Sequence, residues 1–170
     1  MKYRIDKPYP LIEKLQPNPR YASMMLSHLG GLYSEMNAVS LYFYNHIILK
    51  DSWLELSEAM EQISIVEMRH LDIFAQLAYQ LGADPRLWDC QNGYLEYWSP
   101  GYNVYPSHLQ SLLENAMIQE QQTIDIYQKE INCIHNHTIQ QILYRIIEDE
   151  QLHLEIFEYF LNEYQYKKRL

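Results

Sequence analysis

The chain has 170 residues and carries 13 Lys and Arg against 22 Asp and Glu, which gives a formal net charge of −9. This length suits one domain with a sizeable hydrophobic core. The acidic balance, with no run of basic residues before positions 167–169, argues against nucleic acid or an anionic membrane as a partner.

The cysteine content and the N-terminus indicate the compartment. Cys90 and Cys133 are the only cysteines. They are too few for a disulfide framework, a four-cysteine zinc site or a rubredoxin-type iron centre, so we interpret both as free thiols. The N-terminus lacks the apolar stretch of a signal peptide, and no run of about 18 apolar residues could span a bilayer. We therefore expect a cytoplasmic protein without a membrane segment.

The first half of the chain is predicted to form an arm and a helical hairpin. Four prolines punctuate residues 1–19, which we expect to be an arm or docking strap. Helices are expected from about 20 to 49 and from about 53 to 81, the second ended by Gly82 and Pro85. Residues 20–81 then form an antiparallel pair.

The second half repeats this plan after a long connection. Residues 82–107 contain several helix breakers and are expected to be a crossover loop. Helices over about 108–134 and 139–167, separated by a short polar turn, form a second hairpin within 108–170. Apolar residues spaced three and four apart in all four segments indicate an all-α four-helix bundle of two hairpins, forming a single domain over 1–170.

Six polar residues interrupt the apolar seams of these helices in a duplicated pattern. They are Glu35 in the first helix, Glu67 and His70 in the second, Glu120 in the third, and Glu150 and His153 in the fourth. The segments 67–74 and 150–157 share Glu, His, Leu, Ile and Phe in the same order. The two hairpins therefore present equivalent polar groups to one core.

Four carboxylates in one core require partners that neutralise them. Buried carboxylates without partners cost several kcal/mol each, and the seams contain no Lys or Arg. Two divalent cations balance four negative charges, and two neutral imidazoles complete the shells. The Glu-x-x-His spacing brings both side chains to one ion. Oxygen-rich coordination with one imidazole per ion favours iron or manganese over structural zinc. Which glutamates bridge the ions stays open.

The ordered motif Glu, Glu-x-x-His, Glu, Glu-x-x-His resembles that of the ferritin-like dimetal-carboxylate superfamily, particularly its rubrerythrin and bacterioferritin branch. All six positions match, within roughly residues 20–164. The resemblance implies a ferritin-like bundle in which Glu35 and Glu120 are the single-glutamate ligands. The chain has no Cys-rich rubredoxin module, no added carboxylate at Thr123 and no clear haem-binding feature. An external electron-donor protein is therefore expected.

This resemblance implies an enzyme. We expect a non-haem oxidoreductase whose di-iron or iron/manganese centre reacts with hydrogen peroxide or O2, as a rubrerythrin-like peroxide reductase or a ferroxidase, with the six ligands as catalytic residues. Manganese catalase is one alternative. An iron-storage cage subunit and a bundle that binds metal without chemistry are the others. We expect a homodimer.

Several further residues have open roles. Tyr42 and Tyr127 each follow a seam glutamate by seven positions; a radical relay is conceivable, but core packing with a satisfied hydroxyl is the preferred interpretation. His46 is interpreted as a satisfied core or rim histidine. Asp149 could orient a ligand imidazole. The crossover aromatics are expected to pack over the side of the bundle, with a lid or dimer contact as alternatives: Trp88, Tyr94, Tyr97, Trp98, Tyr102 and Tyr105.

Overall fold

The computed structural model describes residues 1–91 and 94–169, with the side chains of Cys90 and Gln91 left undescribed. The elements in chain order are α1 (Pro19–Gly30), α2 (Glu35–Leu49), α3 (Leu54–Gln80), β1 (Trp88–Gln91), β2 (Tyr94–Tyr97), the 3-10 helix η1 (Pro100–Tyr102), α4 (Leu109–Cys133) and α5 (His137–Arg169). The interpretation of Cys90 as a free thiol lies outside the described residues, whereas Cys133 is an exposed free thiol.

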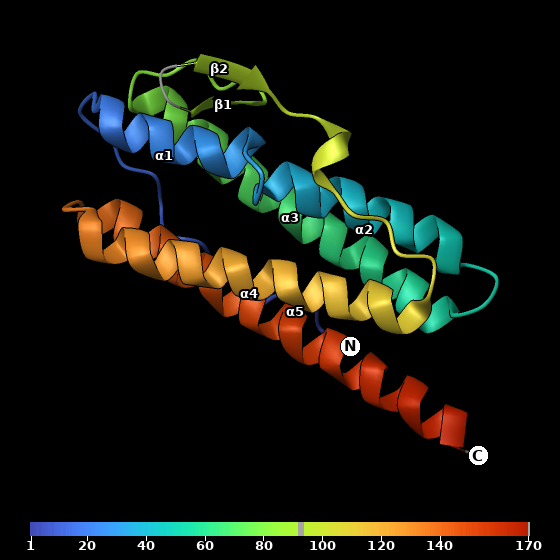
Figure 1. Cartoon of the computed structure of the whole chain (residues 1–170). Helices are drawn as coiled ribbons and strands as arrows, with labels where there is room; N and C mark the ends of the chain where they lie inside the picture. Colours follow the sequence, from blue (N-terminus) through green and yellow to red (C-terminus); the bar gives the residue numbers. More distant parts are fainter. Residues whose placement is uncertain (92–93, 170) are drawn as a thin grey trace.

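Two layers of helices form the bundle. The helices α1 and α2 pack against α3 to form one layer, and α4 packs against α5 to form the other (Figure 1). The chain passes from the first layer to the second through the long connection between α3 and α4, which runs over α2. The prediction of an all-α bundle of two hairpins joined by a long crossover is confirmed.

The first predicted helix, 20–49, is broken, so the prediction of one continuous helix was wrong. The helix α1 ends at Gly30, and α2 begins at Glu35 after Ser34, whose side chain accepts a hydrogen bond from the Asn37 amide. A Cβ at Gly30 would lie 2.5 Å from the backbone nitrogen of Trp88. The end of α1 therefore has to be glycine because the β1 backbone crosses it at close range.

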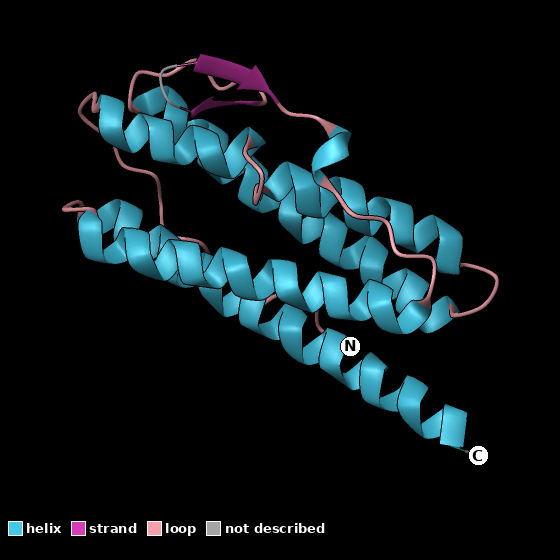
Figure 2. Ribbon diagram, in the orientation of Figure 1, coloured by secondary structure: helices cyan, strands magenta, loops and turns pink. Residues whose placement is uncertain are grey.

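The crossover contains regular structure that was not predicted from the sequence. Strands β1 and β2 pair antiparallel, with Trp88 opposite Tyr97, and η1 follows (Figure 2). The aromatic side chains of this segment only partly pack on the bundle. Trp98 donates a 2.6 Å hydrogen bond to the Asn37 side chain, whereas Tyr94 and Tyr97 are exposed.

The hydrophobic core consists of two clusters along the bundle axis. One is built around residues such as Leu77, Ile131 and Leu143, and the other around residues such as Met60 and Leu113. In α3, α4 and α5 the polar seam residues lie in sequence between the parts of the helix that build the two clusters, and Glu35 lies between α1, which contributes to the first cluster, and the rest of α2, which contributes to the second. The bundle therefore encloses a polar layer between two apolar ones.

Residues 1–18 contain no helix or strand and run along the bundle before α1 (Figure 1). The Leu15 amide donates to the Gln80 side chain at 3.0 Å, and the Asn18 amide donates to the Leu81 carbonyl at 3.0 Å. Earlier residues of this segment contact α5, as described below. Residues 1–18 thus contact both layers of helices.

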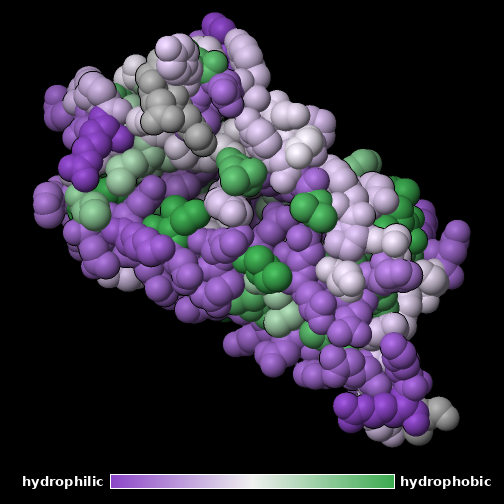
Figure 3. All heavy atoms as spheres, viewed as in Figure 1, coloured by the Kyte–Doolittle hydropathy of each residue, from purple (hydrophilic) through white to green (hydrophobic). Residues whose placement is uncertain are grey.

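Over the residues that the structure describes, no helix combines the length and hydropathy needed to cross a bilayer. On the face seen in Figure 3, hydrophobic side chains are scattered among hydrophilic ones, and the protruding end of α5 is hydrophilic.

Candidate metal centre

The six seam residues meet in the middle of the bundle. Glu35 comes from the first turn of α2, Glu67 and His70 from α3, Glu120 from α4, and Glu150 and His153 from α5. Every one of these residues is buried, with at most 3% of its surface exposed. The structure therefore brings together all the predicted site residues.

One half of the cluster surrounds His70. Its Nδ1 lies 2.9 Å from Glu67 Oε2, 3.1 Å from Glu150 Oε1 and 3.7 Å from Glu35 Oε2. Ligand atoms from these four residues lie within 4.8 Å of one another, close enough to hold one metal ion.

The other half surrounds His153 in the same way. Its Nδ1 lies 2.9 Å from Glu67 Oε1, 3.1 Å from Glu150 Oε2 and 3.9 Å from Glu120 Oε1. Glu67 and Glu150 thus direct one oxygen toward each imidazole, while Glu35 and Glu120 each belong to one half. The geometry makes the two paired glutamates the shared residues and the two single glutamates the terminal ones.

The electrostatics of this layer fit a site for two cations. Glu67 Oε1 and Glu150 Oε1 are buried atoms that lie 2.9 and 3.1 Å from an imidazole Nδ1 but without the geometry of a hydrogen bond. Burial raises the pKa of the Glu120 carboxyl well above its ordinary value, and the carboxylates of Glu150 and Glu67 raise it further. Among the described residues, no Lys or Arg forms an ion pair with any of the four glutamates. Two divalent cations would remove this repulsion.

The same carboxylates raise the pKa values of the two imidazoles. Burial opposes protonation of His153, but the carboxylates of Glu67 and Glu150 hold its pKa well above the ordinary value. For His70, burial is again outweighed, with Glu150 the strongest of the groups that raise the pKa. Cations at this position would replace the proton as the positive partner of the glutamates.

Two tyrosines hold the terminal glutamates across the bundle. The Tyr42 hydroxyl of α2 donates to Glu120 of α4, and the Tyr127 hydroxyl of α4 donates to Glu35 of α2. Burial raises the pKa of both phenols well above the ordinary value, and the adjacent carboxylates add to the effect. The preferred interpretation, a packed tyrosine with a satisfied hydroxyl, is confirmed, and its partner is a seam glutamate in both cases.

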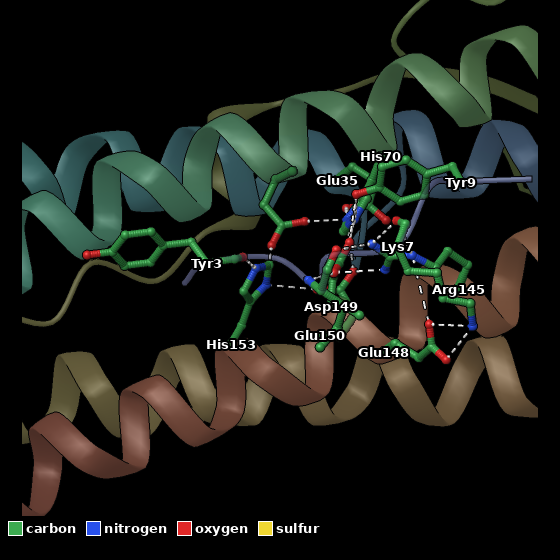
Figure 4. A network of polar contacts seen from close by, with 12 residues as sticks. Tyr3, Lys7, Tyr9, Glu35, His70, Arg145, Glu148, Asp149, Glu150 and His153 are labelled. Carbon is green, nitrogen blue, oxygen red and sulfur yellow. Dashed lines mark hydrogen bonds and ion pairs between the residues drawn. The ribbon is translucent and has the colours of Figure 1, made fainter. Parts of the chain in front are cut away.

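The far side of each imidazole also has a partner. His70 Nε2 lies 3.3 Å from Asp149 Oδ2 and 3.2 Å from the Tyr9 hydroxyl (Figure 4). His153 Nε2 lies 3.0 Å from the backbone carbonyl of Tyr3. Asp149 therefore contacts a seam imidazole, the arrangement considered from the sequence.

Asp149 also has a charged partner that was not predicted from the sequence. Arg145 Nη1 lies 2.8 Å from Asp149 Oδ1, and both side chains are buried. The two residues are four apart on α5, a spacing that places them on one helix face and could have revealed the pair. No sequence pattern could have revealed the Tyr3 carbonyl, because any residue supplies that group.

His46 lies outside the cluster. Its Nδ1 lies 2.9 Å from the Ser57 carbonyl and 3.1 Å from the Ser57 hydroxyl. The interpretation of His46 as a satisfied histidine is confirmed.

A four-helix bundle in which each half contributes Glu and Glu-x-x-His to a buried centre defines the ferritin-like class of dimetal-carboxylate proteins. Within that class, the rubrerythrin family model matches residues 31–161. The chain belongs to the rubrerythrin family.

Three known proteins illustrate this relationship. A curated bacterioferritin from Desulfovibrio desulfuricans is 30% identical over 128 residues, covering 73% of this chain and 66% of that protein, slightly less than two thirds of its length. A solved bacterioferritin from that organism, with its di-iron site in different catalytic states, has a TM-score of 0.72 at 25% identity, covering 86% of this chain and 81% of the other. A manganese catalase from Anabaena has a TM-score of 0.80 at 19% identity, covering 97% and 81%, which shows a shared fold.

Proposed function

We propose that this chain is a non-haem dimetal oxidoreductase that holds two Fe ions, or Fe and Mn, and reacts with hydrogen peroxide or O2. One observation carries the proposal. Glu67 and Glu150 each present one oxygen to each imidazole, within 3.1 Å in all four contacts. A centre for a single ion would not need two glutamates shared between two histidines.

The residues divide into two overlapping ligand sets. Glu35 and His70 would hold one ion, and Glu120 and His153 the other, with Glu67 and Glu150 common to both. The four carboxylates then balance the charge of two divalent ions. When bound, such a pair supplies two electrons for cleavage of the O–O bond of peroxide.

The protein around the centre fixes the ligands and excludes water. Tyr42 and Tyr127 hold the terminal glutamates at the outer ends of the cluster. Apolar clusters above and below the polar layer leave the ligands nearly inaccessible to solvent. Such a low-dielectric site strengthens the electrostatic hold on the cations.

The proposed reaction needs a partner. Reduction of hydrogen peroxide to two water molecules consumes two electrons and two protons. With only two cysteines, the chain cannot form a rubredoxin-type centre, so a separate protein would donate the electrons. The proposal also includes a homodimer, which the mass of the purified protein in solution would test.

The decisive experiment starts with metal analysis of protein produced without metal supplements. Protein reduced and loaded with Fe(II) without oxygen would then receive hydrogen peroxide, and metal oxidation and O2 release would be followed. Oxidation without O2 release supports the proposal. Sustained O2 release without a reductant would instead favour manganese catalase, and a particle of many subunits would favour an iron-storage cage.

Variants separate the site from the fold. Glu67→Ala and His153→Ala should abolish peroxide-dependent oxidation while the far-ultraviolet circular dichroism stays helical. His46→Ala is the matched control, because His46 lies on the same bundle but outside the cluster. Retained oxidation in both site variants would refute the proposal.

A further inference from the structure

The first ten residues, here called the strap, bind to α5 beside the metal centre. The Ile5 amide donates to Asp149 Oδ1 at 2.7 Å. Arg145 donates to the carbonyls of Ile5 at 2.8 Å and Lys7 at 3.0 Å. The Arg145 guanidinium also lies over the Tyr9 ring, 4.5 Å from its centroid. A buried ion pair on α5 thus fixes the strap through its backbone and one aromatic side chain.

The strap reaches both candidate ligand imidazoles on the side opposite the carboxylates. Because Nδ1 of each ring faces the glutamates, Nε2 is the atom left to donate a hydrogen bond. For His153 the acceptor is the Tyr3 carbonyl, 3.0 Å away. For His70 it is Asp149, whose Oδ2 also accepts from the Tyr9 hydroxyl at 2.6 Å. One segment of chain therefore supports both rings.

We propose that the strap is a positioning element of the metal centre and that it makes the two metal positions unequal. The His70 ring is held by a carboxylate that Tyr9 and Arg145 orient, whereas the His153 ring is held by a neutral backbone carbonyl. This inference rests on the proposed dimetal function.

The structure predicts which of the two positions binds a metal ion more tightly. A hydrogen bond to a carboxylate increases the basicity of a ligand imidazole more than a hydrogen bond to a carbonyl does. Asp149 carries this negative charge at no net cost to the centre, because Arg145 balances it at 2.8 Å. The position that includes His70 should therefore bind the first metal ion, and the position that includes His153 the second.

Two changes address the two rings separately. Tyr9→Phe keeps the ring beside Arg145 but removes the hydroxyl that contacts Asp149 and His70. Replacing residues 1–4 by a single methionine removes the backbone carbonyl at position 3. The matched control is Tyr3→Phe, because the Tyr3 ring points away from His153 while its carbonyl remains (Figure 4).

The experiment is a Mn²⁺ titration of the metal-free full chain, with free Mn²⁺ followed by electron paramagnetic resonance. Wild-type protein and Tyr3→Phe should bind two ions with two resolved dissociation constants. Tyr9→Phe should raise the smaller constant by up to about tenfold, the lower end of the effect of losing an outer partner of a metal-bound histidine, because Asp149 remains beside His70 but loses the hydroxyl that orients it. The shortened chain should raise the larger constant. The visible absorption of the Co²⁺-loaded protein should change in Tyr9→Phe at the first equivalent added.

The outcomes separate the two proposals. Wild-type protein that binds no pair of ions would overturn the dimetal function itself. Two ions bound with unchanged constants in Tyr9→Phe, or two constants that rise equally, would overturn the unequal positions and leave the dimetal function standing. If the shortened chain loses its helical circular dichroism, Tyr9→Phe alone decides.

Discussion

Replacing Arg145 by methionine tests how the strap is held. Arg145 is 2% exposed, and its Nη1 lies 2.8 Å from the buried carboxylate of Asp149. Burial opposes ionisation of Asp149, but the contacts with His70, Tyr9, Arg145 and the Ile5 amide lower its pKa well below the ordinary value. Arg145→Met keeps most of the side-chain volume and leaves an anionic carboxylate without its cation.

The expected loss follows from the burial of this pair. Removing one partner of a buried ion pair costs about 3–5 kcal/mol, because the remaining charge stays desolvated. The control is Lys7→Ala, which breaks the ion pair between Lys7 of the strap and Glu148 of α5. That pair is exposed, with side chains 57% and 39% accessible, and such pairs contribute only about 0–1 kcal/mol. The free energies of unfolding of Arg145→Met and Lys7→Ala should therefore differ by about 3 kcal/mol.

The assay is urea unfolding at pH 7 in the presence of a chelator, so that metal binding does not contribute. For a chain of this size each kcal/mol corresponds to about 2–4 °C, so Arg145→Met should also melt roughly 6–20 °C lower than wild type. Asp149→Asn added to Arg145→Met should recover part of the loss, since it removes the unpaired charge. An unfolding free energy for Arg145→Met equal to that of Lys7→Ala would refute the reasoning.

Three further predictions concern the candidate ligands and their partners. Glu67→Ala should lose both metal ions, because Glu67 belongs to both ligand sets, whereas Glu35→Ala should retain one. Elemental analysis after dialysis distinguishes these outcomes, and one bound ion in both variants would contradict the shared role of Glu67. Metal at a hundredfold excess over its dissociation constant should stabilise wild-type protein by about 2.7 kcal/mol per site; a thermal midpoint that does not move with added Mn²⁺ would count against any site. Tyr42→Phe and Tyr127→Phe should each lower the free energy of unfolding in urea by about 1–3 kcal/mol, since each leaves a buried carboxylate without its donor. A marked difference between the two variants would contradict the symmetry of the six-residue cluster.

The sequence predicted most of the fold because helix periodicity is a local signal. The seams of α3, α4 and α5 follow directly from apolar spacing, and their ends lie within a few residues of those predicted. The break between α1 and α2 was missed because it depends on Gly30 meeting the backbone of Trp88, a contact between distant parts of the chain. Strand β2 was missed because all four of its residues are exposed, so that no apolar face creates a pattern. Strand β1 was missed because it is only four residues long and its buried residue Asp89 is polar.

The inner part of the candidate site was predictable for a different reason. A duplicated Glu-x-x-His motif in apolar seams has few solutions other than a shared centre, and the six residues do converge. Which glutamates are shared depends on side-chain direction, which spacing alone does not determine. The groups that contact the far side of the imidazoles could not be predicted from the sequence. The Tyr3 group is a backbone carbonyl, which any residue supplies, and Tyr9 comes from a segment without periodicity.

The duplication itself indicates where a difference between the two metal positions must originate. The six candidate ligands are of the same residue types in both halves, so their identity does not distinguish one proposed position from the other. In the register that aligns Glu67 with Glu150, Asp149 corresponds to Val66 and Arg145 to Gln62. The ion pair on α5 therefore has no equivalent on α3, and the strap binds where that pair is. In the proposed dimetal centre, these outer residues are therefore a source of difference between the two metal positions.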